Sequence, residues 1–138
     1  MRRLTTFALV LAAAALIAAC SSSSTGLTGK TWQLTAITEL VPAFQGVVPA
    51  ADQPNYTIEF KTDGTFNAKA DCNTTSGAYT TTSSGGLTIL PGPTTLVACP
   101  EGSLSPQYIT ALGNAASYAV ANSQLTITLK DGGTLVYK

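Results

Sequence analysis

Two cysteine-containing segments carry the residue types that could do chemistry. Asp71, Cys72 and Asn73 place a carboxylate, a thiol and an amide side by side, and Cys99 follows later in the chain. Such groups could hold a metal ion, form a redox pair or join as a disulfide. The sequence contains no histidine, which removes the most common general base and metal ligand. We therefore expect no catalytic residue, no metal and no cofactor.

Strand alternation separates the members of this group. Small or apolar residues occupy every second position from Phe66 to Cys72, so Cys72 is predicted to face inward and Asp71 to face the other side. Because metal ligands must converge on one point, this pattern favours a structural role over a metal site. Asn73 is expected to satisfy backbone donors in a turn.

Charge and length set broad limits on the function. The chain has 138 residues, the length of one domain, and seven Lys and Arg balance seven Asp and Glu. It shows neither a basic patch for nucleic acid nor an acidic tail. We expect a monomer with no nucleic-acid partner.

The N-terminus has the features of a processing signal. Arg2 and Arg3 precede a continuous apolar run over residues 7–19, which is shorter than the roughly 20 residues of a membrane span. The run ends in Ile-Ala-Ala before Cys20, which resembles the lipobox of bacterial lipoproteins. An ordinary secretory signal with an incidental Cys20 is the alternative.

The lipobox resemblance implies a location. Residues 1–19 would be the lipoprotein signal peptide, Cys20 the lipidated residue, and residues 20–26 a Ser-rich tether. Acyl chains on Cys20 would anchor the protein to the membrane. The protein is therefore expected to be exported and anchored in the bacterial envelope. It would face the periplasm from the outer membrane in a Gram-negative organism, and otherwise lie outside the plasma membrane.

Without Cys20, an even pair of cysteines remains in an exported, oxidising setting. A Cys72–Cys99 disulfide would stabilise the fold by roughly 3.5 kcal/mol, since it closes a loop of about 28 residues. Two free buried thiols or a redox pair are the alternatives, although the spacing is too long for a C-x-x-C motif.

The body of the chain predicts short strands. Trp32, Leu34 and Ala36 alternate with polar residues in a first strand over residues 27–37, and Trp32 is expected in the core. Asp63-Gly64 predicts a hairpin turn. The other expected strands cover residues 56–60, 66–72, 78–82, 87–90, 94–98, 118–121, 124–130 and 134–137.

Residues 39–54 are predicted to be a long loop, because Pro42, Pro49 and Pro54 are spread through it. The loop is unusually apolar. Its apolar side chains either cap one open end of the sheet or form an exposed surface for a protein partner. They are Leu40, Val41, Phe44, Val47 and Val48.

One helix is predicted, with Ser105 as its N-cap and Pro106 at its first position. Tyr108, Ile109 and Leu112 continue at helical spacing, followed by Ala115 and Ala116. Regular short strands with one helix predict a mainly β, β-rich α+β fold: a small antiparallel, barrel-like or curled sheet with one packed helix.

An ordered set of motifs across residues 27–138 resembles the META domain family, which includes the heat-shock lipoprotein HslJ. The motifs are residues 27–34, 56–60 with Asp63-Gly64, Cys72-Asn73, 76–79, Ala98-Cys99-Pro100, the predicted helix, and the hairpin of residues 125–137. The resemblance implies a compact barrel-like domain over residues 27–138, with no established enzymatic activity. Relatives often have Thr-Arg-Met-Ala where this chain has Thr95-Leu96-Val97-Ala98, so any role of that arginine is in doubt here.

Five motif residues are expected to be structural: Trp32, Asn73, Gly77, Tyr79 and Pro100. Gly77 should sit where a Cβ would collide, and Tyr79 should bury its ring with its hydroxyl bonded to a partner.

Three functions remain open. The first is a non-catalytic, lipid-anchored envelope protein supporting integrity or stress tolerance, as the family resemblance implies. The second is a protein-binding or inhibitor module acting through residues 40–48, since several small β-barrel lipoproteins block lysozyme-type enzymes. A hydrolase is disfavoured because the chain lacks histidine and its acids, such as Glu59, Asp63, Asp71 and Glu101, show no pairing in the sequence.

Overall fold

The structure is a computed structural model that describes residues 26–138. The predicted signal peptide, Cys20 and the tether up to residue 25 lie outside the described residues. The strands are β1 (Thr31–Leu40), β2 (Ala43–Val47), β3 (Tyr56–Phe60), β4 (Thr65–Ala70), β5 (Asn73–Thr81), β6 (Leu87–Thr94), β7 (Ala115–Ala121), β8 (Gln124–Leu129) and β9 (Thr134–Tyr137). The helices are α1 (Ser105–Gly113) and a short 3-10 turn, η1 (Gln53–Asn55).

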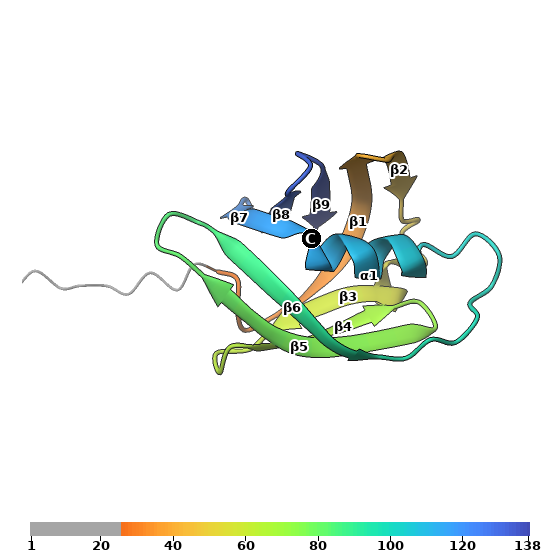
Figure 1. The fold of residues 1–138 in the computed structure, drawn as a ribbon, viewed down its shortest axis with the longest axis horizontal. Coiled ribbons are helices and arrows are strands. Elements are labelled where there is room, and N and C mark those ends of the chain that lie inside the picture. The colour runs from red at the N-terminus through yellow and green to blue at the C-terminus, as the bar shows by residue number, and fades with distance from the viewer. Residues whose placement is uncertain (1–25) are drawn as a thin grey trace, which may run out of the picture.

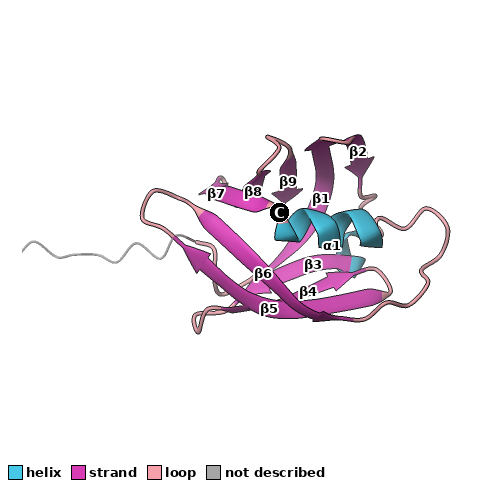
Figure 2. Cartoon of the chain, viewed as in Figure 1, coloured by secondary structure: helices cyan, strands magenta, loops and turns pink. Residues whose placement is uncertain are grey.

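The strands form one antiparallel sheet that curls around the helix. Its order is β6-β5-β4-β3-β1-β9-β8-β7, and β2 pairs with β1 beside β3. Figure 1 shows β3 to β6 below α1 and β2 and β7 to β9 above it, with β1 running from the lower group to the upper one. One bridge, between Gly86 and Ser117, brings the two ends of the sheet together. The predicted mainly β fold with one helix is confirmed, and Figure 2 shows the predominance of strands.

The core lies between the concave face of the sheet and α1. Tyr108, Ala111 and Leu112 of α1 are fully buried against it. Trp32 is buried too, and its indole Nε1 donates a hydrogen bond of 2.8 Å to the Leu27 carbonyl. The prediction that Trp32 packs in the core is confirmed. Among residues 26–138 no helix has the length and apolar character needed to cross a membrane.

The predicted alternation of buried and more exposed side chains is confirmed in β3 and β4 but is shifted by one residue in β1. Tyr56, Ile58 and Phe60 are buried, as predicted for β3. In β1 the inward residue after Leu34 is Ile37, so the prediction for Ala36 is wrong. A register shift between Leu34 and Ala36 in the pairing with β9 inserts the extra residue.

The predicted loop over residues 39–54 is wrong. β1 continues to Leu40, and β2 folds back along it with a register that pairs Leu40 with Ala43. The prolines suggested a loop because proline cannot donate to a ladder. Here Pro42 lies in the turn, and Pro49 and Pro54 follow β2, so none interrupts the pairing.

Several boundaries also differ from the prediction. β5 begins at Asn73 rather than at residue 78, and β6 continues past residue 90 to Thr94. The separate strand predicted over residues 94–98 is wrong, because the chain leaves the sheet after Thr94. Helix α1 has Leu104 as its N-cap, and Ser105 is buried inside the first turn, where Asn73 binds its hydroxyl. Ala115 and Ala116 belong to β7, since Asn114 ends the helix.

Candidate functional site

The two motif cysteines are joined. Cys72 and Cys99 form a disulfide with a Cα–Cα distance of 5.5 Å, as the cysteine count predicted. Cys72 lies in the turn between β4 and β5, and Cys99 lies in the segment of residues 95–104 that links β6 to α1. We call this segment the disulfide loop. The bond therefore ties the loop to the end of a hairpin.

The prediction that Cys72 faces inward is wrong, since its side chain is exposed. β4 ends at Ala70, which pairs directly with Asn73, so Asp71 and Cys72 form a two-residue turn. Asp71 has a positive φ of 60°. The turn breaks the two-residue period, and it sends Asn73 rather than Cys72 into the interior.

Buried Asn73 is the polar centre that positions the disulfide loop. Its Oδ1 accepts hydrogen bonds from the Val97 backbone N at 2.7 Å and the Thr95 hydroxyl at 3.2 Å. Its Nδ2 donates to the Val97 carbonyl at 3.0 Å and to the Ser105 hydroxyl at 3.1 Å. Asn73 does satisfy backbone groups, as predicted, but they belong to a loop far along the chain rather than to its own turn.

The loop so held displays apolar side chains. Leu96 is 89% exposed and Val97 is 60% exposed, although the Val97 backbone is bonded on both sides to Asn73. Pro100 is exposed on the same loop, and its carbonyl accepts from the Ser103 N at 3.2 Å. Figure 1 shows the loop projecting at one end of the long axis, opposite the end where the described chain begins. The sequence did not identify this surface, because residues 94–98 were predicted to be a strand.

Gly77 and Tyr79 have the structural roles expected of them. A Cβ on Gly77 would collide with the Leu90 carbonyl on β6. The Tyr79 ring packs edge-on against Phe60 at 4.9 Å between centroids, and its hydroxyl donates to the Lys61 carbonyl at 2.7 Å. Burial raises the pKa of Tyr79, so the hydroxyl remains a donor at neutral pH.

The predicted partner surface over residues 40–48 is divided by the structure. Val41 and Val47 are 79% and 78% exposed, and Leu40 is exposed next to Val41, with Val47 at the other end of β2. Phe44 is partly buried against the core and Val48 is fully buried. Phe44 and Val48 therefore cover the core, as one of the two expectations had it, whereas the other three side chains are exposed on the hairpin; a protein partner for them stays a prediction. We call Leu40, Val41 and Val47 the hairpin patch.

A carboxylate from a distant turn of the chain holds the backbone at the Leu40 and Val41 end of this patch. Asp131, between β8 and β9, accepts hydrogen bonds from the backbone N of Leu40 at 2.7 Å and of Val41 at 3.0 Å. Its other oxygen accepts from the Gly133 N at 2.8 Å. These backbone bonds, that of Gly133 first, lower the pKa of Asp131. Desolvation and then the nearby Asp131 charge raise the pKa of Glu39.

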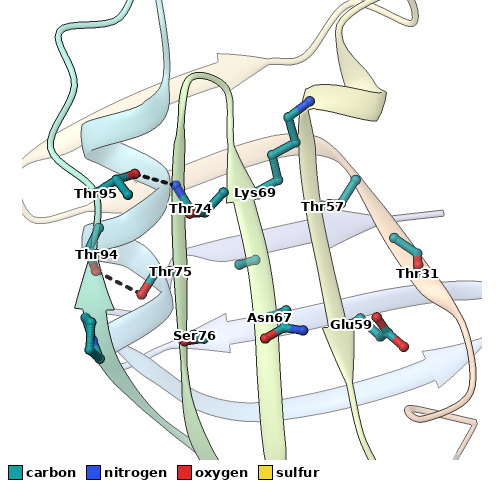
Figure 3. A pocket seen from close by; sticks show the side chains of 12 residues that line it. Thr31, Thr57, Glu59, Asn67, Lys69, Thr74, Thr75, Ser76, Thr94 and Thr95 are labelled. Carbon is teal, nitrogen blue, oxygen red and sulfur yellow. Dashed lines mark hydrogen bonds between the residues drawn. The ribbon is translucent and has the colours of Figure 1, made fainter.

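A hollow lies on the face of the sheet opposite the core, over β3, β4 and β5. It is an open groove of about 550 Å³. Figure 3 shows Thr57, Glu59, Asn67 and Lys69 along its floor, with Thr94 and Thr95 on the β6 side. The Thr95 hydroxyl accepts from the Thr74 N at 2.9 Å, so the groove adjoins the disulfide loop. Thr57, Glu59, Asn67 and Lys69 are the outward-facing residues of β3 and β4. The sequence predicted the strands that carry them but not the groove that they line.

The acids considered for hydrolysis are distributed over the surface. Glu59 lies in the groove, whereas Asp63 accepts from the Thr65 N and hydroxyl in the β3–β4 turn. Asp71 and Glu101 line one shallow depression beside the disulfide loop. Within the described part of the chain, no group of three or more Cys, Asp or Glu side chains could hold a metal ion.

The fold and sequence can be compared with known proteins. An NMR structure of a protein from Burkholderia xenovorans has a TM-score of 0.62 and 24% identity, covering 81% of this chain and 82% of that one. A crystal structure of a DUF4847 family protein from Bacteroides vulgatus has a TM-score of 0.60 and 16% identity, covering 80% and 92%. These likenesses show a shared fold. No curated protein matches the chain.

The family follows from the sequence match. The model of the META domain family matches residues 25–138, which include the described fold, the disulfide and both exposed apolar surfaces. The chain therefore belongs to the META domain family.

Proposed function

We propose that this META domain protein is a non-catalytic, lipid-anchored protein of the bacterial envelope that supports envelope integrity under stress. The lipobox-like end of the apolar run before Cys20 supports the anchor, and the Ser-rich stretch after it would serve as tether. Disulfide-bonded Cys72 and Cys99 are consistent with an oxidising compartment.

The absence of histidine from the sequence and the scatter of the acids support a non-catalytic role. Asp63 is engaged with Thr65, and Asp131 is engaged with three backbone N–H groups, so both carboxylates serve the backbone. Neither is free to act as a general base toward a bound substrate.

Deletion and complementation test the envelope role. A deletion strain should become more sensitive to heat or to drugs that cross the envelope, and the wild-type chain should restore resistance. Cys20→Ser should lose both incorporation of an alkyne-tagged fatty acid and the restored resistance. A deletion strain as resistant as its parent would contradict the proposal. Resistance restored by an unlipidated Cys20→Ser protein would show that the anchor is dispensable.

The hairpin patch supports a second candidate, a protein-binding or inhibitor module. The observation behind it is that Leu40 and Val41 are held by the Asp131 carboxylate while their side chains face solvent. A surface fixed in advance loses little conformational entropy on binding. The exposed apolar patch is thus the part of residues 40–48 suited to a partner.

The test compares two exposed apolar positions. Val41→Asp should abolish capture of an envelope partner by the full chain, whereas Leu90→Asp should not. Leu90 is 60% exposed on β6, well away in sequence and strand order from the hairpin, so it is the matched control. Phe44 is unsuitable as a test position because it packs against the core. Equal capture by wild type and Val41→Asp would remove this candidate.

A further inference from the structure

We propose that the groove on the outer face of β3, β4 and β5 binds an uncharged glycan. The site is distinct from the hairpin patch and does not depend on the lipid anchor. It rests on the register of the strands, on the types of side chain that line the groove, and on which of their polar groups are already bonded.

The strand register arranges the groove floor in two polar rows. In one row Thr31 pairs with Glu59, Glu59 with Asn67, and Asn67 with Ser76. Three strand spacings of about 4.8 Å make this row about 14 Å long. The row and the groove volume of about 550 Å³ fit a short oligomer rather than a single small ion.

The second row runs parallel to the first. Thr57 pairs with Lys69, and Lys69 pairs with Thr74. Each residue stands two positions along its strand from a member of the first row, so the rows lie about 7 Å apart. The groove thus repeats polar groups both along and across the strands, as recognition of a repeating polymer requires.

The lining matches the mixed character of a sugar. A sugar ring has apolar C–H faces and a rim of hydroxyl groups. Each threonine offers a methyl group and a hydroxyl that both donates and accepts, and Pro93 adds an apolar wall. A threonine-rich groove can therefore contact the ring face and the ring hydroxyls together.

Some polar groups in the groove are fixed and others are free. Lys69 Nζ donates to the Asn55 side chain at 2.8 Å, and the Thr94 hydroxyl donates to that of Thr75 at 2.9 Å. The side chains of Thr57, Glu59 and Ser76 make no hydrogen bond within residues 26–138, and Figure 3 draws none from them to the other residues that line the groove. Bonded groups give a rigid frame, and the free groups are left for a ligand.

Charge and topology narrow the ligand class. The groove is lined by one carboxylate, Glu59, and one ammonium group, Lys69, so their charges balance. This balance does not favour a polyanion. An extended peptide would bind by adding to a sheet edge, but β3, β4 and β5 are each paired on both sides. An uncharged polyhydroxyl chain lying across the outer face of the sheet needs neither an excess of positive charge nor a free strand edge.

Titration of the full chain, purified in detergent, with chitotetraose, cellotetraose and maltotetraose tests the proposal. At least one of these should bind saturably, with NMR shifts confined to the outer face of β3 to β5. Ser76→Tyr should fill the groove and weaken binding by roughly tenfold or more. Thr80→Tyr, an exposed position further along β5 and outside the groove, should bind as wild type does. Glu59→Gln, which keeps the size of the side chain, should reduce affinity.

Three results would overturn the proposal. They are no saturable binding of any of the three tetrasaccharides, equal binding by Ser76→Tyr and wild type, and saturable binding only of an uncharged polar peptide used in parallel. Because Cys20→Ser should leave tetrasaccharide binding unchanged, failure of the glycan site is distinguishable from failure of the envelope proposal.

Discussion

The disulfide loop and the hairpin patch both expose apolar side chains, but they are held in different ways. The loop leaves the sheet after Thr94, so its backbone has no ladder, and a disulfide and the buried Asn73 amide hold it. The hairpin patch sits on a ladder of five paired positions between β1 and β2, with one exposed carboxylate at its tip.

The difference shows which motif residues are costly to lose. A segment without backbone pairing needs side-chain and covalent partners to remain in one conformation. This explains why the family motif gathers Cys72, Asn73 and Cys99 around the loop. A hairpin with its own ladder needs only one further contact, which Asp131 supplies from the turn between β8 and β9.

The largest expected effect is loss of the disulfide. The double variant Cys72→Ala and Cys99→Ala should lower the free energy of unfolding by about 3.5 kcal/mol, because the unfolded chain regains the loop's conformational freedom. Urea unfolding of both proteins measures the change. Wild type treated with reductant is the control and should approach the variant. An unchanged urea midpoint would mean that the disulfide does not stabilise the fold.

Asn73→Ala should have the next largest effect, about 2 kcal/mol, because it leaves the Val97 backbone and the Ser105 hydroxyl without their buried partner. The same urea experiment measures it, and amide exchange should rise in the disulfide loop but not at the hairpin patch. Ser76→Ala, at an exposed position on the same strand, is the control. A loss no greater than that of the control would show that the disulfide alone positions the loop.

Asp131→Ala should have a smaller and more local effect. The amides of Leu40, Val41 and Gly133 should exchange faster, since each loses its acceptor, while the disulfide loop remains protected. Asp131→Asn keeps one acceptor oxygen, so its amide exchange rates should lie between those of wild type and Asp131→Ala. Faster exchange in the disulfide loop would show that the two surfaces are coupled.

The hairpin patch should also depend on pH, whereas the disulfide loop should not. The folded-state pKa of Asp131 is below its ordinary value of 3.8, so its contribution is present above that pH and is lost as the pH falls through the lower folded value. Glu39 has the opposite effect on stability. Its folded-state pKa is raised, so it takes up a proton at a pH above its ordinary pKa of 4.5, and this protonation favours the folded state. On acidification, order at the patch should first improve slightly and then fall.

NMR shifts of the Leu40 and Val41 amides across this pH range test the dependence. Asp131→Asn should remove the change at lower pH and leave the change due to Glu39. A titration that is identical in wild type and in Asp131→Asn would contradict the assignment.

The smallest stability effects are expected at the exposed side chains themselves. Leu96→Ser and Val41→Ser should each change the free energy of unfolding by no more than about 0.5 kcal/mol, because neither side chain is buried in the core. Val48→Ser should lower the free energy of unfolding by clearly more, since Val48 is fully buried. Thermal unfolding distinguishes the three. A large loss at Leu96 would indicate an intramolecular packing role for the loop.

Much of the fold could be predicted from local patterns. The alternation of Tyr56, Ile58 and Phe60 identified β3, and Asp63-Gly64 identified its turn, because both signals act over a few residues. The errors arose where a single residue interrupted the two-residue alternation of inward and outward side chains. The positive φ of Asp71 reversed the direction of Cys72, and the shift between Leu34 and Ala36 moved Ile37 into the core.

The sequence by itself determined the family, the mainly β class and the places where Gly77 and Tyr79 serve the fold, and it favoured a disulfide between the two motif cysteines. These depend on residue types and short spacings. Only the tertiary structure decided that Asn73 holds a distant loop, that Asp131 fixes the hairpin patch, and that Thr31, Glu59, Asn67 and Ser76 share one row. Each of these contacts joins segments far apart in the chain, and their meeting depends on strand order and register, which no local pattern specifies.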